Sequence, residues 1–303
     1  MSKAVFHAPA PPPPSANWED LRAVAELVCA GTLTAAGAAL GVNYTTVARR
    51  VARAEKVLGV ALFDRLADGY TPTEEARLVA QHVAQMAEAD HALMRGLAGR
   101  DGRLTGRLTI TAPQLLIAHV LAPALRQFRE AHPDLDLRVR ATNDKLDLTR
   151  READIGIRIS PDPGDTLTGL RLVEQATASF ASQDWADRIT ADPSQPIDWI
   201  LYDGHEGLPR GVAEGWPSSR VRYRFDDMVA MAGAAQAGLG VARMPMFLGR
   251  ALPGLVQVPL VPPTPYQPIW IVAHPDVWRG AKVTAFRETV VRALKAERHR
   301  FGA

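Results

Sequence analysis

The sequence predicts an α/β protein in two parts, an all-α N-terminal part and an α/β C-terminal part. Apolar residues recur at spacings of three and four from Trp18 to about residue 98, which is the period of helices. From Arg107 onward, strand-like segments such as Leu-Thr-Ile-Thr at 108–111 alternate with helical segments. Glycines between the two parts indicate a hinge, at Gly96, Gly99, Gly102 and Gly106.

The composition is that of a globular protein. The 303 residues are enough for two or three domains, and the 47% hydrophobic and 22% charged contents are ordinary. No apolar run reaches the length of a membrane span, and the N-terminus lacks a secretory signal, so we expect a cytoplasmic protein with no membrane partner. The single cysteine, Cys29, excludes an intrachain disulfide, and we expect its side chain to be packed.

The chain begins with a tail and a capped helix. Residues 1–16 contain the run Ala-Pro-Ala-Pro-Pro-Pro-Pro at 8–14, which is typical of an extended, disordered tail. Asn17 is placed to cap the helix that follows, and Glu19 and Asp20 in its first turn complement the helix dipole.

Two helices joined by a tight turn follow at residues 32–58. Gly41 can take the positive φ that ends the first of them, and Asn43 can cap the second. In the second helix, apolar residues at spacings of four, three and four predict one buried stripe of Val47, Val51, Ala54 and Leu58. This arrangement is a helix-turn-helix.

The opposite face of the second helix carries hydroxyl and guanidinium groups at Thr45, Thr46, Arg49, Arg50 and Arg53. Such groups on an exposed helix reach phosphates and base edges in the major groove of DNA. A basic amphipathic helix can also be no more than a solvated face, and the net charge of the chain is only +2. The candidate DNA-contacting residues are Thr34, Asn43, Tyr44, Thr45, Thr46, Arg49, Arg50, Arg53 and Arg65.

A two-stranded wing and a long helix follow. Leu-Phe-Asp-Arg at 62–65 and a Gly69-Tyr70 turn predict the wing, and the helix extends from residue 73 to about 98. Its apolar seam, interrupted by Asp90, needs a partner, which is either a second chain or the protein's own C-terminal domain. The candidate dimerisation residues are Val79, Val83, Met86, Leu93 and Leu97.

This whole run resembles the DNA-binding part of the LysR-type transcriptional regulators. The matching elements are Ala35-Ala36, Gly41-Val42, the polar stretch 43–46, Leu58-Gly59 and Leu62-Phe63-Asp64-Arg65. Three positions depart from the family pattern, because Ala48 stands for a serine, Ala54 for a leucine and Ala76 for a glycine. The missing serine removes one expected phosphate contact, while the exposed Thr/Arg face is intact.

The C-terminal part alternates strands and helices and therefore predicts a parallel sheet with right-handed crossovers. Strand-like segments lie at 108–111, 135–139, 154–159, 178–181, 198–202, 221–225, 239–243 and 267–274. One helix carries Leu121, Leu125 and Phe128, and a short helix is expected near 145–151. A terminal helix at 281–297 is expected to turn inward Val283, Phe286, Val290 and Leu294.

Residues 237–245 match the second-lobe motif of the same family, so the resemblance covers residues 17 to about 297. It implies an effector domain with the two-lobed shape of type 2 periplasmic binding proteins. The predicted domains are a tail (1–16), a winged helix-turn-helix (17–73), a linker helix with hinge (74–106) and an effector domain (107–299). Lobe I would comprise residues 107–160 and 275–299, and lobe II residues 170–267.

The resemblance implies a sequence-specific transcriptional regulator that senses a small molecule. Its partners would be double-stranded DNA, a small-molecule effector and further copies of the chain in a homodimer or homotetramer, with RNA polymerase as a candidate further partner. Pairing is useful because two recognition helices about 34 Å apart can read half-sites one DNA turn apart.

The effector is expected between the lobes, because open parallel sheets bind ligands at the carboxyl ends of their strands. The candidate contacts are Thr111, Pro113, Gln114, Thr142, Asn143, Arg158, Tyr202 and Asp203. The resemblance points first to Gln114 and Asn143, and Arg158 could clamp a carboxylate. As alternatives, Gln114 and Asn143 cap helices and Arg158 pairs with a neighbouring acid.

The sequence carries no signature of catalysis. It lacks a Gly-x-Ser-x-Gly elbow, the glycines of 238–243 do not complete a dinucleotide-binding loop, and the histidines show no metal-ligand spacing. We therefore expect no enzyme activity, no metal and no cofactor apart from the effector. Two alternatives stay open: a small-molecule-binding protein whose helix-turn-helix is an interaction module, and an enzyme on the two-lobed scaffold.

Overall fold

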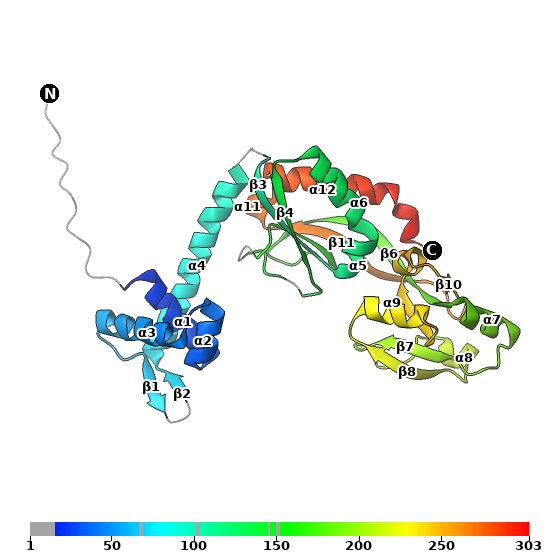
Figure 1. The fold of residues 1–303 in the computed structure, drawn as a ribbon, viewed down its shortest axis with the longest axis horizontal. Helices are drawn as coiled ribbons and strands as arrows, with labels where there is room; N and C mark the ends of the chain where they lie inside the picture. The colour runs from blue at the N-terminus through cyan, green and yellow to red at the C-terminus, as the bar shows by residue number, and fades with distance from the viewer. Residues whose placement is uncertain (1–15, 67–68, 101–103, 145, 150–151, 303) are drawn as a thin grey trace. The chain divides into compact units, whose positions relative to one another are not determined.

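The computed structural model describes residues 16–302 apart from 67–68, 101–103, 145 and 150–151 (Figure 1). The chain forms two compact units, Met1–Leu93 and Met94–Ala303. The predicted disordered tail lies outside the described residues except for Ala16. Each unit has its own hydrophobic core.

The N-terminal unit is a three-helix cluster with a two-stranded wing. Asn17 and Asn43 cap α1 and α3 as predicted, and Thr32 caps α2; each side chain accepts a hydrogen bond from a first-turn N–H. The elements are α1 (Trp18–Ala30), α2 (Leu33–Leu40), α3 (Tyr44–Leu58), β1 (Phe63–Leu66), β2 (Gly69–Pro72) and the long α4 (Glu74–Arg100).

The apolar stripe of α3 packs into the core of this unit. Val47, Val51 and Ala54 are buried, together with apolar residues of α1 and α2. The prediction was wrong for Leu58, which is 40% exposed because it is the last residue before the left-handed Gly59 turns the chain away. The prediction for Cys29 was also wrong, since its side chain is exposed at the end of α1.

A close approach of backbones fixes the angle between α2 and α3. A Cβ at Gly37 would lie 2.8 Å from the carbonyl oxygen of Val42 and 3.2 Å from the amide nitrogen of Tyr44. The Val42 amide donates to the Gly37 carbonyl at 2.9 Å, which closes the turn. Gly41 takes the predicted left-handed conformation with φ 65°. Only glycine at position 37 therefore lets the turn fold back this tightly.

Helix α4 differs from the prediction at both ends. Val83 is buried and Val79 packs on the N-terminal core, so these two members of the predicted dimerisation seam are already covered by their own chain. The helix also continues through Gly96 and Gly99 to Arg100, so these glycines are helical rather than part of a hinge. The remaining seam residues stay exposed: Met86 at 48%, Leu93 at 61% and Leu97 at 59%.

The C-terminal unit is built on a mixed nine-stranded sheet, in the order β4-β3-β5-β11-β6-β9-β7-β8 with β10 paired to β6. The strands are β3 (Gly106–Ala112), β4 (Leu135–Ala141), β5 (Ile155–Ile159), β6 (Thr168–Ser182), β7 (Asp198–Tyr202), β8 (Arg220–Phe225), β9 (Val241–Pro245), β10 (Leu255–Gln257) and β11 (Thr264–Ala273). The predicted parallel pairing is found within each lobe, but it does not extend to the two strands that join them. Parallel pairs join β3 to β4 and β5, and β7 to β8 and β9, while β6 and β11 run antiparallel to their neighbours.

The two long strands β6 and β11 connect two lobes. In lobe I, β11 pairs with β5, which lies beside β3 and β4. In lobe II, β6 pairs with β9, which lies beside β7 and β8. A register shift separates these ends between Tyr266 and Ile269. There the Gln175 side chain donates to the Gln267 carbonyl at 2.6 Å. The lobes therefore share continuous backbone pairing.

Helices cover both lobes (Figure 1). In lobe I they are α5 (Gln114–Leu116), the π-helical η1 (Ile117–Leu121), α6 (Ala122–Ala131), α11 (Pro275–Trp278) and α12 (Ala281–Ala296), followed by the 3₁₀ turn η2 (Arg298–Arg300). In lobe II they are α7 (Gln183–Ala191), α8 (Val212–Gly215) and α9 (Met228–Gln236), and α10 (Met246–Ala251) follows β9. The inward face predicted for the terminal helix is confirmed.

Two local predictions in this unit need correction. Residues 146–149 form an irregular segment and a turn rather than part of a short helix, and the rest of 145–151 lies outside the described residues or beyond the turn. The strand predicted at 239–243 begins two residues later, at Val241. The reason is Gly240, where a Cβ would lie 2.3 Å from the Asp198 carbonyl oxygen, so the backbone there passes against β7.

The Gly37 contact generates a stability prediction. Gly37→Ala should lower the free energy of unfolding of the N-terminal unit by about 1–3 kcal/mol, because the added methyl group overlaps backbone that cannot move independently. Urea denaturation of the full chain followed by circular dichroism measures the change. Gly233→Ala in α9, where a Cβ meets nothing within 4 Å, is the matched control. The control should be neutral or stabilising, and equal behaviour of the two variants would contradict the close approach.

Candidate nucleic-acid interface and ligand cavity

The start of α3 presents an exposed polar surface. Tyr44 is 54% exposed, Thr45 and Arg49 are also exposed, and Thr46 is half-buried. The Asn43 side-chain oxygen accepts from the Thr45 amide at 3.0 Å and from the Thr45 hydroxyl at 3.1 Å. This cap holds the first turn of α3 in place, and it leaves the amide group of Asn43 and the ring of Tyr44 directed at solvent or a partner.

Two arginines on α3 are braced by carboxylates of α1. Arg53 donates from Nη2 to Asp20 Oδ1 at 2.6 Å and from Nε to Asp20 Oδ2 at 3.1 Å, while Arg50 lies 3.2 Å from Glu19. The hydrogen bonds that Arg53 donates to the Asp20 carboxylate, followed by the charge of that carboxylate, raise the pKa of Arg53. Sequence analysis assigned Glu19 and Asp20 to the helix dipole alone, and the structure shows that they also fix α3 against α1.

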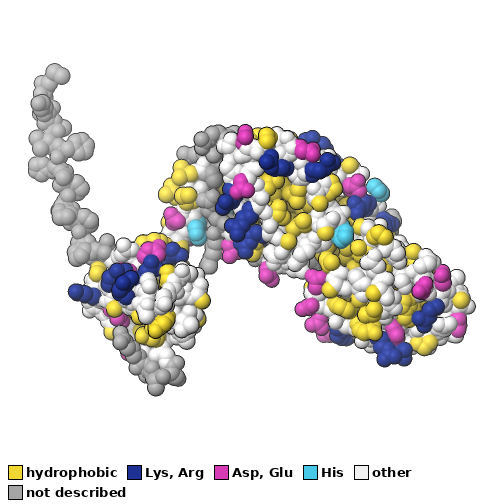
Figure 2. Space-filling model, viewed as in Figure 1, with side chains coloured by type: hydrophobic (Ala, Val, Ile, Leu, Met, Phe, Trp, Pro, Cys, Tyr) yellow, Lys and Arg dark blue, Asp and Glu magenta, His cyan; other side chains and the backbone are white. Residues whose placement is uncertain are grey.

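Arg49 is the arginine of α3 with no such partner. Within the described part of the chain it forms no ion pair or hydrogen bond, and its side chain is exposed. Thr34 is exposed on α2, and Arg65 lies on β1 opposite Tyr70, with its side chain outside the described residues. On the visible face of this unit, basic and acidic side chains lie beside one another (Figure 2). The surface is therefore locally basic rather than uniformly positive.

Two side chains that sequence analysis left without a role attach the wing to the helices. Glu55 Oε1 accepts from the Leu62 amide at 2.9 Å. Thr73 Oγ1 contacts the Leu62 carbonyl oxygen at 3.1 Å and the Ala76 amide at 3.2 Å. The wing is thus fixed from both sides at one residue, Leu62, whose side chain is fully buried. Glu55 precedes Leu62 by only seven residues, and this short separation could have indicated the contact.

The lobe I part of the predicted effector site comes together as a small hollow. Five predicted residues line it with their neighbours on β3, β5 and the loop after β4: Thr111, Pro113, Thr142, Asn143 and Arg158. Its volume is about 60 Å³, which is room for a water molecule or a small polar group rather than a whole metabolite. Gln114 is exposed at the start of α5 and does not line this hollow.

Arg158 is already engaged inside its own chain. Its Nη2 donates to the Leu146 carbonyl oxygen at 2.7 Å. Burial lowers the pKa of Arg158, and the nearby charge of Asp147 only partly offsets that effect. The group is desolvated without a carboxylate hydrogen bond, so it retains an affinity for an anion.

One hydrogen bond joins the two lobes beside this hollow. Asn143 Nδ2 donates to Asp227 Oδ2 at 3.4 Å, and the other oxygen of Asp227 caps α9 through the amides of Val229 and Ala230. Asn143 therefore contacts lobe II directly. Asp203, in contrast, is exposed, and its amide donates to the Phe225 carbonyl at 2.7 Å between β7 and β8.

Lobe II contains a larger cavity, of about 520 Å³. Of the predicted residues only Tyr202 lines it, beside His205, Arg210, Met228, Arg243 and Tyr266. This size suits a compact organic molecule. Burial raises the pKa of Tyr266, and the neighbouring Tyr202 adds to the shift, so the Tyr266 hydroxyl stays protonated and can donate a hydrogen bond. This cavity could not be predicted from local sequence patterns, because its walls come from five separated segments.

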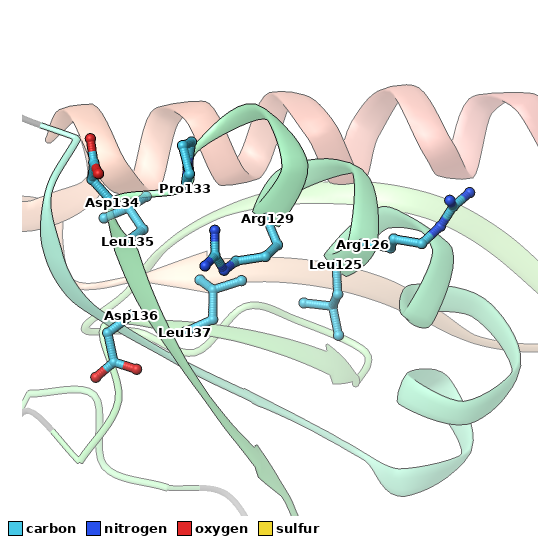
Figure 3. Close-up of a pocket in the computed structure, with 8 residues that line it drawn as sticks. All are labelled: Leu125, Arg126, Arg129, Pro133, Asp134, Leu135, Asp136 and Leu137. Atoms are coloured by element: carbon cyan, nitrogen blue, oxygen red, sulfur yellow. The ribbon is translucent and has the colours of Figure 1, made fainter.

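A third hollow, of about 680 Å³, is an open groove between α6 and β4 (Figure 3). The leucine side chains of Leu125 and Leu137 line its floor, and Arg129 extends over Leu137. None of the predicted effector residues lines it. Because it lies between α6 and β4, away from the predicted effector residues, we do not assign the effector to it.

Other kinds of site find no support in the described ranges. No group of three or more His, Cys, Asp or Glu side chains there could hold a metal ion. Among the same residues, no helix is both long and apolar enough to cross a lipid bilayer.

Comparisons with known proteins agree with this architecture. The bacterial regulatory helix-turn-helix domain of the lysR family matches residues 18–77, and the LysR substrate binding domain matches residues 101–295. The chain is 29% identical to the Mau operon transcriptional activator of Paracoccus denitrificans, over 86% of this chain and 90% of that protein. It is 31% identical to the transcriptional activator AmpR of Rhodobacter capsulatus, over 71% of this chain and 75% of that protein.

Solved structures share the fold. The full-length virulence activator AphB of Vibrio cholerae matches with a TM-score of 0.54 at 22% identity, over 91% of this chain and 99% of that one. Full-length CbnR in complex with its target DNA matches with a TM-score of 0.55 at 17% identity, over 91% of this chain and 99% of that one. The predicted fold class is thereby confirmed.

The brace between α1 and α3 generates a second prediction. Asp20→Asn should destabilise the N-terminal unit by about 1 kcal/mol, because a buried carboxylate that accepts two hydrogen bonds loses its charge. Glu19→Gln, whose carboxylate is more exposed than that of Asp20, should cost less than about 0.5 kcal/mol and is the matched control. Thermal unfolding of both variants measures the difference, and a larger loss for Glu19→Gln would refute this ranking.

Proposed function

Because the chain belongs to the LysR family of DNA-binding transcriptional regulators with an effector-binding domain, we propose that it reads a specific DNA sequence with the start of α3. The observation that carries this proposal is the exposed surface formed by Tyr44, Thr45 and Arg49 on a helix whose other face is buried. Hydroxyl, amide and guanidinium groups are the donors that contact bases and phosphates in the major groove.

The contacts differ in their expected roles. Arg49 is free to bind a phosphate or a guanine edge. Arg50 and Arg53 instead hold α3 against α1 through their ion pairs, and they add positive charge to the surface. Thr34 on α2 and Arg65 on the wing would contact the backbone on either side of the groove. The protein would carry out this function in the cytoplasm, where a bacterial regulator meets its DNA.

The protein functions in this proposal as a homodimer or a dimer of dimers. Met86, Leu93 and Leu97 form an exposed apolar face on α4, and apolar side chains at this spacing pair with a second helix in water. Two chains place two α3 helices on one duplex and double the number of phosphate contacts.

The effector domain supplies the control in this proposal. A ligand changes DNA binding only if it has different affinities for two arrangements of the protein. The Asn143–Asp227 hydrogen bond joins the lobes next to both ligand cavities, so a ligand there would favour one lobe arrangement. Regulation through binding requires no catalytic step, in keeping with a family of regulators.

The role of Arg49 can be tested directly. Full-length wild-type protein is used to select a duplex from a randomised pool, and binding is then measured by fluorescence anisotropy at several salt concentrations. Arg49→Ala should weaken binding about tenfold or more, and the slope of log affinity against log salt should fall by about 0.9 for each lost phosphate contact, about 1.8 in a dimer.

Arg279→Ala is the matched control, because Arg279 is exposed in the C-terminal unit and its side chain forms no ion pair or hydrogen bond in the described structure. It should bind DNA like the wild type. Equal binding by Arg49→Ala and wild type would count against the proposed interface. If no duplex is enriched at all, the helix-turn-helix as an interaction module becomes the better account.

The pairing of α4 gives a separate prediction. Leu93→Asp should shift the protein to monomers in analytical ultracentrifugation, because a charge would replace an apolar side chain in the paired face. Gln85→Asp, also exposed on α4 but outside that face, is the matched control and should leave the oligomer intact. A Leu93→Asp protein that sediments like the wild type would show that α4 is not the pairing element.

A further inference from the structure

Arg243 lines the lobe II cavity in an unusual position for an arginine. It lies on β9 between the buried residues Ala242 and Met244. Its Nη2 donates to the carbonyl oxygens of Thr177 at 3.2 Å and Pro262 at 2.9 Å, and to the Thr264 hydroxyl at 2.8 Å. Three acceptors thus hold one nitrogen of the guanidinium group in a defined place.

The other terminal nitrogen of Arg243 has no partner. Nη1 is buried from solvent and forms no hydrogen bond within the described structure. A buried donor without an acceptor is costly, and native proteins rarely keep one without a functional reason. Burial also lowers the pKa of Arg243, and no carboxylate offsets this effect.

The surroundings of Arg243 favour an anion over a neutral molecule. The described residues that line the cavity include Arg210 and His205 but no aspartate or glutamate. The protonated hydroxyl of Tyr266 can donate a further hydrogen bond. A carboxylate can accept a charge-assisted hydrogen bond from a guanidinium nitrogen together with one from such a hydroxyl.

The rest of the wall is apolar and aromatic. Ile200, Leu208, Met228, Met244 and Val261 lie in it, together with Tyr202, whose ring meets that of His205 at a centroid distance of 6.4 Å. A fully polar ligand would leave this surface unmatched, whereas a hydrocarbon or aromatic body would cover it.

We propose that the lobe II cavity binds a compact carboxylate with an apolar body, and that Arg243 holds its carboxylate group. The proposal rests on the proposed function, since such a ligand would be the effector. It places the effector mainly within lobe II rather than in the 60 Å³ hollow of lobe I. Because Thr177 and Thr264 lie on the two strands that run through both lobes, an anion at Arg243 would act on the lobe connection.

The test compares acids with their neutral amides on the full-length protein. The probes are 4-phenylbutyrate against 4-phenylbutyramide and hexanoate against hexanamide, measured by isothermal titration calorimetry and by thermal shift. Each pair has nearly the same shape, so the ratio of affinities isolates the charge. We expect the acids to bind about tenfold or more tightly than the amides, as for a charge-assisted pair in a desolvated site.

Variants assign the preference to a residue. Arg243→Met should remove the preference for the acids, and Arg243→Lys should keep part of it, because lysine keeps the charge but loses the planar fork. Arg287→Met is the matched control, since Arg287 also donates to a carbonyl oxygen, that of Trp278, but lies outside the cavity. This control should keep the full preference.

Met228→Trp provides evidence that does not depend on Arg243 variants folding. The larger side chain would fill the cavity without touching the anchoring contacts of Arg243, so the binding of acids and amides should both be lost. The proposal is overturned if wild-type protein binds neither acid, if acids and amides bind equally, or if Arg243→Met or Met228→Trp binds the acids like the wild type.

Failure of this proposal can be separated from failure of the proposed function. DNA binding is measured on the same preparations without ligand. If a selected duplex binds and no acid does, the ligand class is wrong and the regulator proposal stands. If an acid binds and no duplex is selected, the ligand site stands and the DNA interface is wrong.

Discussion

The seating of α3 is the constraint on which the N-terminal unit depends. Gly37 lets the turn at Val42 approach α2 within the distance that a side chain would occupy, and the buried stripe of α3 fills the space between α1 and α2. Asp20 then fixes the far part of α3 through Arg53. Because one face and the far part of the helix are fixed, the polar residues at the start of α3 are left exposed to solvent. The surface proposed for DNA is the consequence of this packing.

The C-terminal unit depends on an equivalent constraint, the pairing of β6 with β11. These strands continue through both lobes, so the lobes are joined by paired strands, with register shifts between Tyr266 and Trp270. Arg243 attaches to both strands at Thr177 and Thr264, close to the register shift at Tyr266. A ligand at this arginine and the Asn143–Asp227 contact would therefore act on the same element. Coupling between ligand and DNA needs such an element with two arrangements.

Local signals predicted much of the fold, and non-local pairings were the part that sequence could not supply. The caps at Asn17 and Asn43 and the inward face of α12 follow from contacts within a few residues, so periodicity was enough to find them. The antiparallel course of β6 and β11 joins segments about ninety residues apart, as in the Gln175–Gln267 hydrogen bond, and no local pattern encodes it. Five of the predicted effector residues line one hollow in lobe I, whereas Gln114 and Asp203 lie outside it.

Photo-crosslinking from α3 shows whether the start of this helix lies against DNA. A photoreactive side chain is placed at Thr45 in one variant and at Val57 in another, since both positions are exposed on α3 but lie near its opposite ends. Full-length protein bound to its selected duplex should crosslink to DNA from position 45 and not from position 57. Crosslinking from position 57 alone, or from neither position while the complex is intact, would contradict the account of how α3 meets its partner.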